Sequence, residues 1–119
     1  MQKLFVLDNS AILTLKFIQF YGTKYGCLGY KGLGSIQLCK QRHPKRKKYK
    51  KSQLLKFLIL SSRMNYTRSS GIVYRCAGMH VCGLTARGNP QGSRLNHKVG
   101  YDLRRRGLMK VCLAADGLY

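Results

Sequence analysis

The apolar residues of this 119-residue chain fall into short runs, and this pattern limits the folds it can adopt. Such runs occupy residues 4–7, 13–21, 36–39, 54–60, 72–74 and 81–84. Glycines, polar turn residues or basic residues separate them, and short apolar runs bounded by turn signals favour strands. Six short strands without helical crossovers predict a mainly β fold, a small barrel or sandwich. An oligonucleotide-binding-like (OB-like) barrel is the natural candidate.

Turn residues between the runs predict how the strands connect. Asp8-Asn9-Ser10 separates the first two runs and predicts a hairpin, because such side chains bond nearby backbone. The glycines between residues 22 and 34 fit turns and strand ends better than a helix. The run 54–60 is interrupted only by Lys56 and predicts a buried central strand. Ser69-Ser70-Gly71 then predicts a turn beside a projecting ribbon.

The residues after position 90 carry a different pattern. Asn96 is a candidate N-cap for a short helix over 99–106, which Gly107 would end. Within it, Asp102 is expected to form an exposed pair with Arg105 or Arg106. The apolar patch 108–113 fits either a further turn of helix or a strand. We expect a single domain over 1–119, with barrel and ribbon in 1–90 and a helical appendage in 91–119.

The charge of the chain points to a polyanionic partner. Lys and Arg number 23 against three acids, all Asp, which gives a formal net charge of +20. Such a chain repels itself until a polyanion arrives, and nucleic acid is the commonest one in a cell. The densest block is 40–51, with eight basic residues in twelve, and phosphate contact is favoured there over a solvated loop or a localisation signal. Tyr49 and Tyr66 interleave aromatic rings with these cations, as base-stacking proteins do.

Membrane insertion and export are not expected. The longest stretch without a charged residue is the eleven residues 76–86, whereas a spanning helix needs about 20 apolar residues. The N-terminus has neither a signal-peptide core nor the features of a transit peptide. Five cysteines without a Cys-x-x-Cys pair predict free thiols in a reducing compartment.

Catalytic motifs are missing from the sequence. Neither a nucleophile-elbow Gly-x-Ser-x-Gly, a His-Glu-x-x-His pattern nor a phosphate-cradling glycine motif occurs. The residues Cys76, His80 and Cys82 could supply three zinc ligands, but no fourth lies nearby in the sequence. We therefore expect no enzyme and no cofactor, and a small metal-dependent enzyme remains a remote alternative.

Four motifs in the chain resemble those of a known family. They are Val6-Leu7-Asp8-Asn9-Ser10-Ala11, Gly92-Ser93-Arg94-Leu95, Asp102-Leu103-Arg104 and Leu108-Met109-Lys110-Val111. In this order and at nearly these spacings they resemble the motifs of universal large-ribosomal-subunit protein fourteen. Lys50-Lys51-Ser52-Gln53, 57–60 and Arg68-Ser69-Ser70-Gly71 resemble its basic loop, strand and turn.

The sequence departs from the family pattern at several of these motifs. Ala11 and Ser52 stand where the family has glycine, so a turn that needs a positive φ there would have to change its local geometry. His97-Lys98 replaces a Gly-Pro pair. Ala115 replaces a proline, which removes a source of rigidity from the C-terminal tip.

The resemblance implies both a fold and a function. It implies a five-stranded barrel with a β-ribbon and two short C-terminal helices, acting as a non-catalytic constituent of the large ribosomal subunit. Implied partners are large-subunit rRNA, neighbouring ribosomal protein nineteen, small-subunit rRNA at an intersubunit bridge, and a ribosome-silencing factor at the C-terminal face. By position, Arg94 and Lys110 match that face. The residues predicted to bind rRNA are Lys45, Arg46, Lys47, Lys48, Lys50, Lys51, Arg68, Arg75, Arg104 and Arg105.

Composition also bears on the compartment. Glu is absent, Tyr, Phe and Cys are frequent, and the chain enters the family motif almost at its start, without an import segment. We therefore expect an organelle-encoded protein of the mitochondrial ribosome. The competing interpretation is a free-standing single-strand nucleic-acid-binding protein that uses the same barrel and charges.

Overall fold

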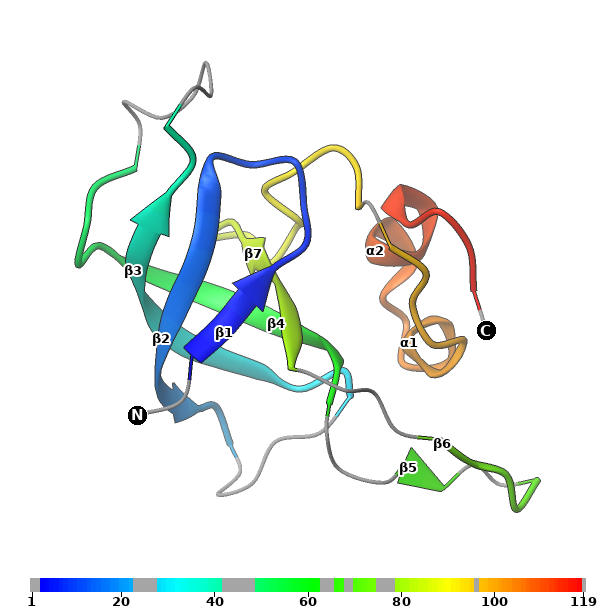
Figure 1. Cartoon of the computed structure of the whole chain (residues 1–119). Helices are drawn as coiled ribbons and strands as arrows, with labels where there is room; N and C mark the ends of the chain where they lie inside the picture. The colour runs from blue at the N-terminus through cyan, green and yellow to red at the C-terminus, as the bar shows by residue number, and fades with distance from the viewer. Residues whose placement is uncertain are drawn as a thin grey trace.

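The structure is a computed structural model that describes residues 3–22, 28–41, 49–62, 66–67, 70–74, 79–95 and 97–118. Its elements are β1 (Lys3–Val6), β2 (Ile12–Phe20), β3 (Lys31–Cys39), β4 (Leu54–Ser61), β5 (Tyr66–Thr67), β6 (Val73–Tyr74), β7 (His80–Leu84), α1 (Asp102–Arg105) and α2 (Met109–Ala114). Five strands form a closed barrel in the order β1-β2-β3-β4-β7, while β5 and β6 pair as a ribbon that extends away from it (Figure 1). The predicted mainly β fold, with its barrel, ribbon and two helices, is confirmed.

The barrel closes through β1, which pairs with a strand on each side. It runs antiparallel to β2 and parallel to β7, where Phe5 lies opposite His80 and Val6 opposite Val81. The β2–β3, β3–β4 and β4–β7 pairs are antiparallel. Because a closed sheet leaves no unpaired strand edge, the backbone groups of the barrel strands find partners within it. The antiparallel β1–β2 pair confirms the predicted hairpin.

β4 takes part in two separate cores, which explains its dense apolar sequence. Leu55, Phe57 and Ile59 belong to the core inside the barrel. Leu58 and Leu60 belong to a second core, which also contains β7 residues and apolar side chains of the C-terminal segment. From Phe57 onward both faces of β4 are therefore covered, so apolar residues are needed there at successive positions rather than alternate ones. This confirms the prediction of a buried strand.

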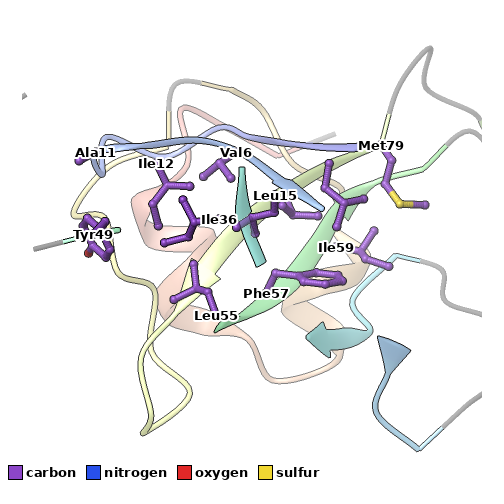
Figure 2. Close-up of a cluster of buried hydrophobic side chains, with 12 residues drawn as sticks. Val6, Ala11, Ile12, Leu15, Ile36, Tyr49, Leu55, Phe57, Ile59 and Met79 are labelled. Carbon is purple, nitrogen blue, oxygen red and sulfur yellow. The ribbon is translucent and has the colours of Figure 1, made fainter. Parts of the chain in front are cut away.

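Phe57 is fully buried in the core inside the barrel (Figure 2). Its ring centroid lies 6.4 Å from those of both Phe17 and Phe20 in edge-on arrangements. A Cβ built on Gly32 would lie 2.5 Å from Cζ of Phe57, and one on Gly34 would lie 3.0 Å from a backbone oxygen of β2. Gly32 is the second residue of β3, at a strand end as predicted, whereas Gly34 lies in the strand interior and the assignment is wrong for it. At both positions neighbouring atoms occupy the space a side chain would need.

The C-terminal segment packs on the outer face of β4 and β7, with α1 and α2 beside the barrel (Figure 1). The predicted helix over 99–106 begins too early: Val99 forms an isolated bridge with Leu118, and α1 starts at Asp102. Asn96 lies outside the described residues. Asp102 is 7% exposed, so the expectation that its side chain is exposed is also wrong. In the described residues, neither helix has the length and apolarity to cross a membrane.

Ser52 lies in the turn that leads into β4, in a backbone conformation that usually needs glycine. Its φ is +69°, a left-handed backbone conformation that residues other than glycine rarely adopt. The N–H of Ser52 donates to the carbonyl of Ile36 at 2.8 Å, which ties the turn to β3. Position 52 therefore adopts a positive φ without glycine, and this bond holds the turn while Ser52 bears the strain.

Candidate nucleic-acid interface

The acidic side chains are placed so that the surface is overwhelmingly basic. Asp8 is 1% and Asp102 7% exposed, whereas the side chain of Asp116 is 44% exposed. Oδ1 of Asp116 lies 3.9 Å from Nε of Arg94, and such an exposed pair contributes little to stability. The 23 Lys and Arg side chains are thus matched by one exposed acidic side chain. This imbalance attracts a polyanion.

Four of the predicted rRNA-binding residues lie in the described part of the chain, and all four are exposed. Lys50 and Lys51 lie in the turn that leads into β4, where the N–H of Gln53 donates to the carbonyl of Lys50 at 3.2 Å. Arg104 and Arg105 lie on α1, at the other end of the sequence. The remaining predicted residues lie outside the described residues: Lys45, Arg46, Lys47, Lys48, Arg68 and Arg75.

The Asp8-Asn9-Ser10 motif docks two distant segments onto the barrel. The buried carboxylate of Asp8 accepts hydrogen bonds from the N–H of Ser10 at 3.1 Å and of Gly83 at 3.3 Å. The N–H of Asn9 donates to the carbonyl of Arg94 at 3.1 Å, and the N–H of Arg94 lies 3.4 Å from Oδ1 of Asn9. Two of the motifs that carry the family resemblance are therefore in direct contact, and this contact positions Arg94.

Arg94 and Lys110 are both exposed, as their predicted role in partner binding requires. They have different immediate neighbours. Arg94 lies beside Asp116, whereas Nζ of Lys110 donates to Oδ1 of Asn89 at 3.1 Å. Lys110 is thereby held against the loop that follows β7.

Tyr49 does not serve as a base-stacking platform, contrary to the expectation from its place in the basic block. It is 7% exposed and belongs to the barrel core (Figure 2). Its hydroxyl hydrogen-bonds to the side chain of Gln91, and burial, followed by the charge of Asp8, raises the pKa of Tyr49. Tyr66 lies in β5, but its side chain is outside the described part of the structure.

The candidate zinc ligands are engaged in other interactions where the structure describes them. Nδ1 of His80 lies 2.7 Å from Oγ of Ser61, and its ring stacks on His97 with centroids 5.8 Å apart. Burial, and then His97, lowers the pKa of His80. Cys82 is fully buried, which raises the pKa of its thiol, while Cys76 lies outside the described residues. Within the described ranges, no three His, Cys, Asp or Glu side chains are grouped to hold a metal ion.

Sequence reasoning missed two neighbouring cavities that share two lining residues, and we call them together the aromatic–basic groove. The first cavity, of about 390 Å³, is lined by Tyr21, Gly22, Gly29, Tyr30, Lys31, Arg106 and Leu108. The second, of about 340 Å³, is lined by Tyr21, Lys31, Lys56, Leu84, Ala86, Arg87 and Gly88. Tyr21 and Lys31 line both cavities. The lining residues come from segments far apart in the sequence, so no pattern of residue spacing predicts the groove.

Comparison with known families agrees with the motifs and the barrel. The sequence profile of the family described as Ribosomal protein L14p/L23e matches residues 1–119. A search among curated proteins finds no match. The family's proteins are structural constituents of the large ribosomal subunit, not enzymes. The profile spans the barrel, the ribbon and the C-terminal helices alike, so the chain belongs to the Ribosomal protein L14p/L23e family.

Proposed function

We propose that this protein binds large-subunit rRNA through its exposed Lys and Arg side chains, with the barrel as a rigid frame. The supporting observation is the single exposed acidic side chain among 23 basic residues. RNA helices are recognised mainly through backbone shape and 2′-hydroxyls, so phosphate contacts should outnumber contacts to base edges. The predicted residues of the basic block and of α1 supply such contacts.

Sedimentation of a cell or organelle lysate through a sucrose gradient at moderately high salt tests this function. Migration with the large subunit and the monosome is the expected result. A peak at the top of the gradient would favour a free-standing single-strand nucleic-acid-binding protein instead.

Replacing Lys47, Lys48, Lys50 and Lys51 together by Gln should weaken incorporation into the subunit. The smaller double variant Lys50→Gln/Lys51→Gln has a charge-matched control in Lys3→Gln/Lys16→Gln, because all four of these lysines are exposed. Unchanged incorporation of the quadruple variant would refute the role of the basic block.

The finer partners form part of the same proposal. The protein would contact ribosomal protein nineteen and small-subunit rRNA at an intersubunit bridge, and its C-terminal face would receive a ribosome-silencing factor. The exposure of Arg94 and Lys110 supports the last of these. Arg94→Glu and Lys110→Glu should each weaken capture of the purified silencing factor, while Lys16→Glu should leave it unchanged.

The compartment is proposed as the mitochondrial matrix, with the chain encoded in the organelle. The absence of Glu and the frequent Tyr, Phe and Cys support this proposal. Isotope labelling of new proteins in cells treated with cycloheximide tests it, since organellar translation resists that inhibitor. Loss of labelling of this protein would place its synthesis in the cytosol.

A further inference from the structure

We propose that the aromatic–basic groove holds one unpaired nucleotide of an RNA strand, with the base in the first cavity and the adjoining phosphates in the second. The inference rests on the proposed binding of rRNA and specifies which kind of RNA residue this part of the surface takes. It is carried by the way aromatic and cationic side chains divide between the two cavities.

The first cavity carries the groups that stack on a base. Tyr21 and Tyr30 both line it, and the guanidinium carbon of Arg106 lies 4.6 Å from the ring centroid of Tyr30. Tyrosine rings and guanidinium planes are the usual stacking partners of unpaired bases in RNA-binding proteins. The volume, about 390 Å³, lies at the small end of the range for ligand pockets, which suits one nucleotide better than a longer segment.

The second cavity carries the groups that neutralise phosphate. Lys31, Lys56 and Arg87 line it, and Nζ of Lys56 also lies 5.9 Å from the ring centroid of Tyr21, at the boundary between the cavities. Among the residues that the structure describes, none that lines either cavity is acidic. Positive charge is thus concentrated beside the aromatic rings, as a backbone that continues from a stacked base requires.

Backbone contacts hold the groove in this shape. The N–H of Tyr21 donates to the carbonyl of Lys31 at 3.0 Å, which fixes the two residues shared by the cavities. Gly29 has a φ of +85°, and a Cβ there would lie 2.7 Å from Cδ of Arg106. The missing side chain therefore lets Arg106 reach Tyr30. Arg87 lies in a turn closed by the bond from the N–H of Gly88 to the carbonyl of Thr85, at 2.9 Å.

This chemistry favours an unpaired base over a base pair. Inside a duplex the faces of each base are covered by its stacked neighbours, so a ring in a protein cavity cannot reach them. A bulged or looped-out base exposes both faces. The groove should therefore distinguish a helix with a bulge from a fully paired helix of equal charge, which simple phosphate attraction does not.

Fluorescence anisotropy with the full-length protein and two RNA hairpins tests the inference. The hairpins have the same number of phosphates, and one carries a single bulged adenosine. The wild-type protein should bind the bulged hairpin more tightly. Tyr21→Leu should weaken that binding about 5- to 150-fold, the range for loss of one stacked base, and leave the paired hairpin unaffected. Tyr21→Phe, which keeps the ring, is the matched control and should stay within about twofold of wild type.

The charge part of the inference has its own variant pair. Lys56→Gln/Arg87→Gln should reduce the slope of log affinity against log salt for the bulged hairpin by about two. Lys3→Gln/Lys16→Gln removes the same charge from exposed positions outside the groove and should leave the slope unchanged. Equal reductions in both double variants would overturn the placement of the phosphates.

A readout in the wild-type protein guards against variants that fail to fold. Replacing the bulged adenosine by 2-aminopurine should give fluorescence quenching on binding, because the base becomes stacked. Equal affinity for the two hairpins, or binding without quenching, would overturn the groove as a nucleotide site while leaving rRNA binding intact. Failure to bind either hairpin at near-physiological salt would instead count against the proposed function itself.

Discussion

Replacing Asp8 by Asn should destabilise the protein far more than the same replacement at Asp116. The Asp8 carboxylate is 1% exposed and accepts bonds from two backbone N–H groups, those of Ser10 and Gly83, and from the hydroxyl of Ser10. An Asn side chain offers one acceptor oxygen and turns its NH₂ group toward one of these donors. One buried donor is then unsatisfied, at about 1–3 kcal/mol, and the remaining bonds lose their charged partner, at about 1 kcal/mol.

Relief of the buried charge offsets part of this cost, so we expect a net loss of about 2–4 kcal/mol in the free energy of unfolding. Asp116→Asn makes the same change in net charge at an exposed pair and should cost less than about 0.5 kcal/mol. Urea unfolding followed by far-UV circular dichroism measures both values. Equal losses in the two variants would show that net charge, not the buried hydrogen bonds of Asp8, determines the effect.

Three other changes give further tests by the same unfolding assay. Gly32→Ala should cost about 1–3 kcal/mol by overpacking against Phe57, whereas Gly117→Ala, whose Cβ would meet nothing closer than 3.6 Å, should be nearly neutral; equal effects would contradict the packing argument. Ser52→Gly should stabilise the protein by about 0.5–1 kcal/mol by removing strain at a φ of +69°, and a loss of stability would show that the turn is not strained. The pKa of His80 is lowered in the folded state, so the unfolded chain binds that proton more readily. Stability should therefore be full above about pH 6.5 and fall as the pH drops through that value, and His80→Gln should flatten the fall; an unchanged profile would refute the assignment.

The barrel could be predicted because its strands are encoded locally. Each apolar run ends in turn residues, and the run of β4, interrupted only by Lys56, indicates burial on both faces. The need for glycine at two positions of β3 could not be predicted this way, because Gly32 and Gly34 make sense only once the register places Phe57 against them. Tyr49 shows the same limit, since nothing in a basic block indicates that its one tyrosine turns into the core.

The candidate interface was predictable only in part, for a related reason. Composition predicted that the surface is positively charged. The family motifs pointed to Arg94 and Lys110 as partner-binding residues, and both are exposed. The aromatic–basic groove is lined by residues of β3, β4 and β7, of the loops beside them and of the C-terminal segment, so its residues share no local pattern. Such a site can be recognised only after the pairing register of the strands is known, because the register brings its residues together.

Salt should act on folding and on RNA binding with opposite signs. The second core attaches the C-terminal segment to the barrel through Leu95, Val99, Leu103 and Val111, all at most 3% exposed. Apolar burial of this kind does not weaken as salt screens charge. With a net charge of +20, salt instead relieves the repulsion of the folded chain for itself. Between about 50 and 200 mM salt, the free energy of unfolding should therefore rise while affinity for RNA falls steeply. A fall in both would mean that ion pairs, rather than the two apolar cores, hold this basic protein together.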